Sequence, residues 1–262
     1  MLNKFWFDAK NINCFKNGFS VIKNLNLKLK YSENVILIGP NGSGKSSLIE
    51  IINRNIYPVV ANESKLKIFD KELINLWELR NKISTINNDI KNRIHPNLQV
   101  FDLILSGLYG RYCYVQNKTE RDSYKVEKIM EKMNISNLSK KNFSYLSDGE
   151  KQISLIARAL IKEPEILILD EPIANLDYKS KFFVIDKINE LSKLNTKILC
   201  VTHDISTIIK IYDRVIMLKD GRIIADGEQS KVINSDNLNK LYGIEVEVTK
   251  NNGIWNINRL SK

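Results

Sequence analysis

A glycine-rich segment near residue 40 has the residue types and the spacing of a phosphate-binding loop. It follows the apolar run Val35–Ile38 and precedes a helical pattern from Lys45 to Asn53, which is the strand–loop–helix context that such a loop requires. Its glycines let backbone N–H groups turn toward phosphate oxygens, and the helix N-terminus adds a partial positive charge. Lys45 can reach the β- and γ-phosphates, and Ser46 can hold Mg²⁺. The segment predicts nucleotide binding, with a fortuitous glycine turn as the weaker alternative. The candidate residues are Gly39, Pro40, Asn41, Gly42, Ser43, Gly44, Lys45, Ser46 and Ser47.

A second apolar run ends in two carboxylates. Ile166–Leu169 is followed directly by Asp170 and Glu171. Ligands bind at the carboxyl ends of parallel strands, so both side chains are expected at the same edge of a sheet. Asp170 is suited to bind Mg²⁺, and Glu171 to polarise a water for attack on the γ-phosphate as the catalytic base. Turns attract acids in any case, so the pair indicates catalysis mainly because the phosphate-binding loop is also present.

The segment Leu146–Glu150 resembles the signature sequence LSGGQ of the ATP-binding cassette (ABC) ATPases. It lies ahead of the strand that carries the two carboxylates, as in that family. Ser147 and Gly149 match the signature, whereas Asp148 and Glu150 depart from it. The aspartate places an acid near the γ-phosphate of a bound nucleotide, which predicts weaker ATP binding or slower turnover. A helix N-cap of the form Ser-x-x-Glu explains the same residues, and both interpretations can hold together.

Further motifs extend the resemblance over almost the whole chain. Ala174–Asp177 is similar to the family's D-loop, which implies a place for Asp177 in the site. His203 takes the position of the switch histidine, which implies contact with the γ-phosphate. Phe15 stands where the family places an aromatic ring against adenine, with a place in the core as the alternative. Asn88 occupies the position of the Q-loop glutamine and is one methylene shorter, which implies a longer contact with Mg²⁺ or the attacking water.

The periodicity of apolar residues predicts an α/β fold in which a helical block interrupts strand–helix alternation. The expected class is a P-loop NTPase core with a mostly parallel sheet, an N-terminal antiparallel β subdomain and an inserted helical subdomain. We expect one ABC ATPase domain over residues 1–262. Residues 1–87 and 162–262 would form its nucleotide-binding core with the β subdomain, and residues 88–161 its helical signature subdomain. Helices are expected at Thr119–Lys132, Gly149–Ile161 and Phe182–Leu194, with Thr119 as the cap of the first and Asp122 three residues later. A final hairpin is expected at Ile244–Ile257, turned at Asn251-Asn252-Gly253.

Composition excludes several other functions. The formal net charge is +10, but the basic residues are dispersed, so no nucleic-acid partner is expected. No apolar run approaches the roughly 20 residues of a membrane-spanning helix, and the first residues lack the apolar core of a signal peptide. The chain is therefore expected in the cytosol. Cys14, Cys113 and Cys200 have neither metal-type nor redox spacing and are predicted to be buried or half-buried thiols.

The resemblance implies an ATPase that uses ATP and Mg²⁺ and works as a head-to-tail dimer. Each ATP would lie between one copy's phosphate-binding loop and Ser147–Gly149 of a second ABC subunit, which is expected to be a second copy of the chain. An integral membrane permease, with a substrate-binding protein as a further candidate partner, would place the chain at the inner face of the plasma membrane. Pieces such as Trp77–Arg80 and Leu241–Ile244 resemble metal-chelate and molybdate-type importer cassettes. Two alternatives stay open: a soluble ABC ATPase acting on nucleic acid or the ribosome, and a weakly hydrolysing regulatory ABC protein.

Overall fold

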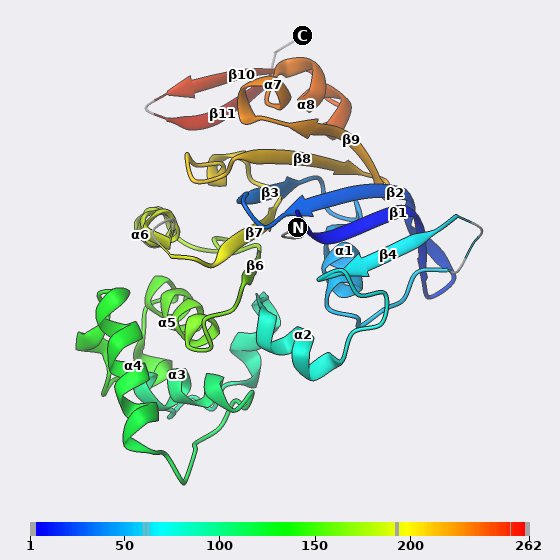
Figure 1. Ribbon diagram of the computed structural model, residues 1–262. Helices are drawn as coiled ribbons and strands as arrows, with labels where there is room; N and C mark the ends of the chain where they lie inside the picture. The colour runs from blue at the N-terminus through cyan, green and yellow to red at the C-terminus, as the bar shows by residue number, and fades with distance from the viewer. Residues whose placement is uncertain (1–3, 60, 62, 192–193, 252, 260–262) are drawn as a thin grey trace. The chain divides into compact units, whose positions relative to one another are not determined.

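The computed structural model describes residues 4–59, 61, 63–191, 194–251 and 253–259 (Figure 1). The chain divides into two compact units. Unit 1 comprises Met1–Arg80 and Lys197–Lys262, and unit 2 comprises Asn81–Thr196. The mixed α/β class, with mostly parallel central strands and antiparallel N-terminal strands, confirms the predicted fold class.

Unit 1 begins with a three-stranded antiparallel sheet in the order β2-β1-β4. Its strands are β1 (Phe5–Lys16), β2 (Phe19–Lys30) and β4 (Lys65–Ile68). In β2 the leucines at 25, 27 and 29 are buried while the polar residues between them are exposed, which is the period of a strand with one covered face. The turn at Asn17 and Gly18 has φ angles of 51° and 81°, so both residues take the left-handed conformation of a tight hairpin turn.

The parallel strands of unit 1 position the phosphate-binding loop. β3 (Val35–Ile38) pairs in parallel with β7 (Lys197–Thr202) on one side and with β8 (Arg214–Lys219) on the other. All four residues of β3 are buried, as the continuous apolar run predicts for a strand covered on both faces. β9 (Arg222–Gly227) pairs antiparallel with β8, and α1 (Lys45–Ile52) follows the loop after β3.

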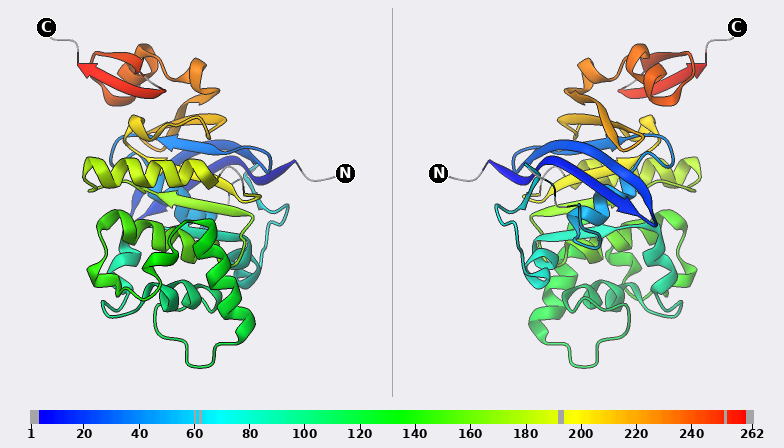
Figure 2. Two further views of the ribbon diagram at one scale, coloured as in Figure 1. Left: turned by 90° about the vertical axis from the view of Figure 1, so that its left-hand side faces the viewer. Right: turned by 90° about the vertical axis from the view of Figure 1, so that its right-hand side faces the viewer.

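Four C-terminal elements complete unit 1. They are α7 (Gln229–Val232), α8 (Ser235–Tyr242), β10 (Val246–Asn251) and β11 (Ile254–Arg259). Figure 2 shows the β10–β11 hairpin beside these two short helices. The hairpin was expected from the sequence, with the turn residue Asn252 outside the described residues, whereas α7 and α8 were not predicted.

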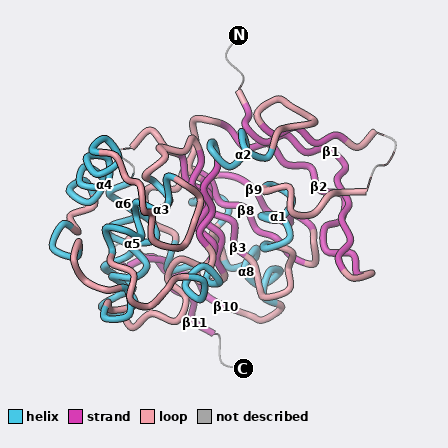
Figure 3. Tube along the Cα trace, turned by 90° about the horizontal axis from the view of Figure 1, so that it is seen from below, coloured by secondary structure: helices cyan, strands magenta, loops and turns pink. Residues whose placement is uncertain are grey.

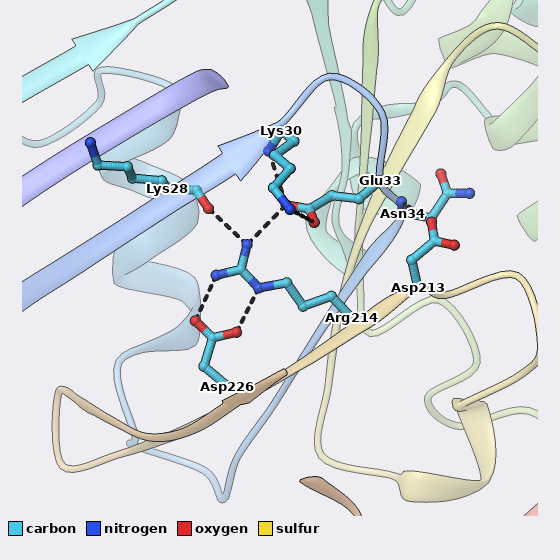
Figure 4. A network of polar contacts seen from close by, with 7 residues as sticks. All are labelled: Lys28, Lys30, Glu33, Asn34, Asp213, Arg214 and Asp226. Atoms are coloured by element: carbon cyan, nitrogen blue, oxygen red, sulfur yellow. Dashed lines mark hydrogen bonds and ion pairs between the residues drawn. The ribbon is translucent and has the colours of Figure 1, made fainter. Parts of the chain in front are cut away.

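An ion-pair network ties the start of β8 to β9 and to the β2–β3 turn (Figure 4). The Nε and Nη2 atoms of Arg214 donate to the Asp226 carboxylate at 2.5 and 2.6 Å. Its Nη1 atom donates to Glu33 at 2.9 Å and to the carbonyl oxygen of Lys28 at 2.8 Å. The Glu33 side chain is 9% exposed, so it depends on these partners to offset its lost hydration.

Replacing Arg214 with Met is expected to lower the free energy of unfolding by about 2 kcal/mol, because it leaves the Glu33 and Asp226 carboxylates without their guanidinium partner. Urea unfolding measures the change. Lys231→Met is the matched control, since its ion pair with Glu228 has both side chains largely exposed and contributes about 0–1 kcal/mol. Equal losses in the two variants would contradict the role assigned to Arg214.

Unit 2 combines a parallel strand pair with a group of helices. β5 (Ile83–Ile86) pairs in parallel with β6 (Ile166–Asp170). Between and after these strands lie α3 (Val100–Leu108), α4 (Glu120–Lys132), α5 (Asp148–Leu160) and α6 (Tyr178–Glu190), together with the short 3-10 helices η1 (Asn88–Arg93), η2 (Ser136–Leu138) and η3 (Phe143–Tyr145). α5 packs against α3, α4, α6 and β5, and Figure 3 shows the four α-helices gathered together. A short helix, α2 (Leu76–Lys82), spans the sequence boundary between the two units.

Two expectations about local structure need correction. α6 begins at Tyr178 rather than at Phe182, because the Asp177 side chain accepts from the Ser180 backbone N–H at 3.0 Å and caps the helix. Cys113 is exposed, in the connection between α3 and α4, while Cys14 and Cys200 are buried as predicted. The expected capping box of Thr119 with Asp122 at the start of α4 is confirmed. Within the described residues, the helices are all too short or too polar to cross a membrane.

Candidate nucleotide-binding site

The phosphate-binding loop of unit 1 is built from close backbone contacts that only glycine permits. The Gly39 N–H donates to the carbonyl oxygen of Thr202 at 3.3 Å, and a Cβ on Gly39 would collide with the carbonyl oxygen of Leu218. Gly44 is the N-cap residue of α1 with φ 102°, and a Cβ there would lie 2.6 Å from the carbonyl oxygen of Val21. The loop is therefore held against β2, β7 and β8, and it opens onto the N-terminus of α1, where backbone N–H groups favour an anion.

The side chains of this loop are suited to phosphate and to a cation. The Lys45 side chain is largely buried, and its ammonium donates to the carbonyl oxygens of Gly39 at 2.8 Å and Pro40 at 2.9 Å. Ser43 Oγ is buried without a hydrogen-bond partner in the described part of the chain. A buried hydroxyl of this kind normally needs a partner, and a phosphate oxygen would supply one. Ser46 is exposed at the second residue of α1, and its hydroxyl is an oxygen ligand of the kind that Mg²⁺ prefers.

The remaining residues of the phosphate-binding loop form its turn and its connection to α1. Asn41 and Gly42 form its exposed turn, where Gly42 has φ 79°. Ser47 is buried on α1, behind the loop. The segment from Gly39 to Ser47, the phosphate cradle, connects β3 to α1, and phosphate binding by this segment stays a prediction.

Phe15 lies near the end of β1, and its side chain is 54% exposed. That exposure excludes the alternative in which Phe15 is a core residue. Its neighbour Lys16 forms an ion pair at 2.8 Å with Glu50 of α1, so this part of β1 lies beside the helix that follows the phosphate-binding loop. The ring is accessible for stacking on a base, and adenine contact remains a prediction.

His203 follows β7 directly and is also in unit 1. Its side chain is exposed, while Thr202 before it and Ile205 after it are buried. Asp204 shapes the segment: its backbone N–H donates to Thr202 Oγ1 at 3.1 Å, and its carboxylate accepts from the Ser206 N–H at 2.8 Å. The contact between Gly39 N and Thr202 O brings the residue before His203 to the start of the phosphate-binding loop.

In unit 2, Asp170 ends β6 and Glu171 follows it, both half-buried. Glu171 has φ 52°, a left-handed backbone conformation that is uncommon for a residue with a side chain. Such conformations cost of order 1–3 kcal/mol and concentrate at functional sites, where they aim a side chain. The carbonyl oxygen of Glu171 accepts from Ala174 N–H at 3.2 Å, which closes the turn that leads to Asp177.

The segment that resembles the signature is also a helix cap. Ser147 is the N-cap of α5: its Oγ accepts from Glu150 N–H at 3.2 Å, and Glu150 Oε2 accepts from Ser147 N–H at 2.8 Å. The capping interpretation of the sequence is therefore confirmed, and it is compatible with a site role. Gly149 is buried, and a Cβ on it would lie 3.2 Å from Ser180 Cβ. The start of α5 thus packs tightly on the start of α6, beside Asp177.

Both acids that depart from the family signature have a cationic neighbour. Lys151 forms an ion pair with Asp148 at 3.3 Å, and Lys141 forms one with Glu150 at 3.3 Å. Partial burial tends to raise the pKa of the Glu150 carboxyl, but the Ser147 N–H and Lys141 outweigh it and lower that pKa. Burial lowers the pKa of the Lys91 ammonium, and nearby Asp148 partly opposes this effect. Lysines therefore partly compensate the negative charge of Asp148.

Replacing Asp148 with Gly is expected to raise the steady-state ATPase rate about two- to fivefold, because it removes a carboxylate from the segment assigned to the γ-phosphate. The rate of phosphate release at saturating ATP measures this change in the ATPase rate. Glu120→Gly is the matched control, since Glu120 is the first residue of α4 behind its own N-cap, as Asp148 is in α5. A lower rate in Asp148→Gly would show that the acid is adapted to its site.

The segment after β5 is only partly described. Asn88 begins η1, but its side chain lies outside the described residues, so its predicted contact with Mg²⁺ or water stays a prediction. Its neighbour Asn87, which was not singled out from the sequence, has an Oδ1 atom that is buried without a partner in the described part of the chain. His95 is exposed in the loop after η1, and its Nδ1 accepts from Asn97 N–H at 3.3 Å.

The structure thus groups the predicted residues within each unit. In unit 1 it brings the phosphate-binding loop to the residue before His203, and in unit 2 it brings Gly149 to the start of α6 beside Asp177. Sequence reasoning assigned no contact to several side chains that lie in or beside the motifs. They are Asn87, Lys141, Lys151, Ser180 and Tyr242, the last of which donates to the carbonyl oxygen of His203.

Comparisons with known proteins agree with these motifs. The family model described as ABC transporter matches residues 22–174, which is more than half of the chain. An uncharacterized ABC transporter ATP-binding protein of Methanocaldococcus jannaschii is 33% identical over 236 residues, covering 89% of this chain and 90% of that protein.

Solved structures show the same fold. The structure of an inward-facing conformation of a putative metal-chelate type ABC transporter aligns over 99% of both chains with a TM-score of 0.79 and 22% identity. The ATP-binding cassette MJ0796, in a dimeric post-hydrolysis state bound to ADP and Pi, covers 85% of this chain and 98% of its own, with a TM-score of 0.68 and 26% identity. The predicted resemblance to metal-chelate importer cassettes is confirmed at the level of fold. The chain belongs to the ABC transporter family and is an ATP-hydrolysing cassette of that family.

Proposed function

We propose that this chain binds ATP with Mg²⁺, hydrolyses it in a head-to-tail dimer, and thereby energises a membrane transporter. The observation that carries the proposal is the phosphate cradle of unit 1, in which buried Lys45 and the unpartnered Ser43 hydroxyl lie at the N-terminus of α1. An uncompensated buried hydroxyl and the backbone N–H groups of a helix N-terminus favour an anion with several acceptor oxygens, which is what a nucleotide triphosphate provides.

Each candidate residue has a role that its chemistry supports. Lys45 and the backbone N–H groups of the loop bind the β- and γ-phosphates, and Phe15 stacks on adenine. Ser46 and Asp170 are oxygen ligands for Mg²⁺, with the Asn88 amide as a further ligand. Mg²⁺, when bound, neutralises charge that develops on the phosphate oxygens. Glu171 accepts a proton from the attacking water, while His203 contacts the γ-phosphate and responds to its presence.

The second copy completes the site in this proposal. Ser147, Asp148, Gly149 and Glu150 of one copy face the nucleotide held by the loop of the other, with Asp177 at the same interface. A two-fold arrangement of this kind is self-complementary, so one surface serves both copies. ATP then favours the closed dimer, and loss of the γ-phosphate contacts favours separation. The division into a nucleotide-binding core of residues 1–87 and 162–262 and a signature subdomain of residues 88–161 belongs to the same proposal.

In this proposal, the ATP hydrolysis cycle drives transport of a substrate across a membrane. We infer an integral membrane permease as partner, which would hold the chain at the inner face of the plasma membrane, and a substrate-binding protein as a further partner of the complex. The likeness in fold to a cassette of a putative metal-chelate type transporter makes metal-chelate import the first transport reaction to test. No nucleic-acid partner is proposed.

Affinity purification of the tagged Glu171→Gln chain with ATP, from detergent-solubilised membranes of the native cell, tests this function. The proposal predicts a polytopic membrane protein at one or two copies per cassette dimer, with the two cassettes held together in ATP and separated in ADP. Lys45→Ala in the same tagged chain is the control for nucleotide dependence. Recovery of only ribosomal, nucleic-acid or other soluble partners would contradict the transport proposal and leave the ATPase chemistry in place.

A further inference from the structure

The C-terminal elements of unit 1 hold the segment that carries His203. β11 lies against the short 3-10 helix η5 (Ile205–Thr207), two residues after His203. The Gln229 side chain at the start of α7 donates from Nε2 to the carbonyl oxygens of Ile209 at 2.8 Å and Tyr212 at 2.7 Å. Tyr242, the last residue of α8, donates from its hydroxyl to the carbonyl oxygen of His203 at 2.9 Å. Three elements distant in sequence thus contact one segment.

The helix α8, which carries the Tyr242 hydroxyl, is held in place at both of its ends. α8 begins at the Asn234 cap, whose side chain accepts from Asn237 N–H at 2.9 Å, and ends at Gly243 in the left-handed conformation with φ 71°. Lys219 at the end of β8 donates to the carbonyl oxygen of Lys240 at 2.5 Å, which ties the last turn of α8 to the sheet. This end of the helix is therefore fixed relative to β8, the strand that pairs with β3 ahead of the phosphate-binding loop.

The acceptor belongs to the peptide group that links His203 to Asp204. The next residue is restrained by its own contacts, since Asp204 N–H donates to Thr202 Oγ1 and Thr207 Oγ1 donates to the Asp204 carbonyl oxygen at 2.7 Å. The His203 side chain, by contrast, is exposed. Fixing the carbonyl of a residue restricts its ψ angle, and with it the direction in which the exposed imidazole points. The hydrogen bond from Tyr242 to the His203 carbonyl oxygen therefore influences the orientation of the imidazole, although Tyr242 bonds to the backbone and not to the ring.

We propose that Tyr242 is a positioning residue for His203, and that the C-terminal segment 229–259 contributes to turnover through this contact. The inference rests on the proposed role of His203 at the γ-phosphate. It assigns a part in the ATPase cycle to the hydroxyl of Tyr242, a residue of the Leu241–Ile244 segment to which the sequence gave no chemical role. ATP binding through the loop after β3 does not depend on this contact, so the effect falls on the rate of hydrolysis and not on affinity.

Steady-state hydrolysis by the purified full chain tests the proposal with the Tyr242→Phe variant, which keeps the ring and removes only the hydroxyl. We expect kcat to fall about three- to tenfold, as the loss of one hydrogen bond predicts, with KM for ATP within about twofold of wild type. Tyr124→Phe is the matched control, since Tyr124 is largely exposed on α4, and its rate should equal that of wild type. An unchanged kcat in Tyr242→Phe would overturn the inference.

The double variant with His203→Ala separates positioning from a general structural effect. If Tyr242 acts through His203, Tyr242→Phe causes little further loss in the His203→Ala background, so the two effects are not additive. The same fold-loss in both backgrounds would overturn the inference and leave the proposed function standing. A wild-type rate in His203→Ala alone would instead overturn the proposed role of His203, and the inference with it.

Discussion

Replacing Glu171 with Gln is expected to lower ATP turnover by a factor on the order of 10²–10⁴ while leaving nucleotide binding in place, because the amide no longer accepts a proton from the attacking water. Glu171 directly follows Asp170 at the end of β6, where carboxylates at the carboxyl end of a parallel strand can meet a ligand. The substitution preserves the size of the side chain, so the folded state should be little affected. Phosphate release at saturating MgATP measures turnover.

The same variant is expected to accumulate as an ATP-bound dimer, because the step that separates the two copies no longer occurs. Light scattering after size-exclusion chromatography, with ATP or ADP in the buffer, measures the mass. Glu163→Gln is the matched control: Glu163 is exposed shortly before β6, also with positive φ, and this variant should hydrolyse ATP and return to a monomer. Hydrolysis at the wild-type rate in Glu171→Gln would contradict the assignment of the base.

Replacing Lys45 with Ala is expected to weaken ATP binding by a factor on the order of 100, because hydrogen bonds from a charged group to phosphate contribute about 1.5–3 kcal/mol each. The change also removes the donor that bridges the carbonyl oxygens of Gly39 and Pro40, so the cradle itself loses a restraint. Isothermal titration with ATP measures the affinity.

Lys71→Ala is the control for loss of a lysine. Its ammonium forms an exposed ion pair with Glu78 at 2.7 Å, in the same unit and away from the loop. Its affinity for ATP should equal that of wild type. Equal affinities for ATP in Lys45→Ala and wild type would contradict the phosphate-binding role of the loop.

Local periodicity was enough to predict the elements that carry the motifs. Val35–Ile38 and Ile166–Leu169 are short apolar runs followed by glycines or acids, and the structure makes both of them parallel strands. The capping box at Thr119 was predicted because its two partners are three residues apart. The start of α6 was placed four residues late, since the cap by Asp177 precedes the first apolar residues of the helix.

Contacts between residues that are distant in the chain could not be predicted from the sequence. Arg214 pairs with Glu33 across 181 positions, and Tyr242 donates to His203 across 39. Neither has a local pattern, because each depends on where the strands of unit 1 bring the chain. Lys91 is also distant from Asp148 in the sequence, and the fold brings the two charges near each other, whereas Lys151 pairs with Asp148 from three residues away on the same helix.

Mixing two inactive variants tests the head-to-tail site most directly. Lys45→Ala removes the phosphate contact, and Ser147→Asp keeps the helix cap but adds a carboxylate toward the partner's γ-phosphate. Because one copy's loop meets the other copy's signature, a mixed dimer contains one site with both parts intact. Random pairing should then restore about a quarter of the wild-type ATPase rate. A mixture that stays as inactive as its two components would contradict a site shared between two copies.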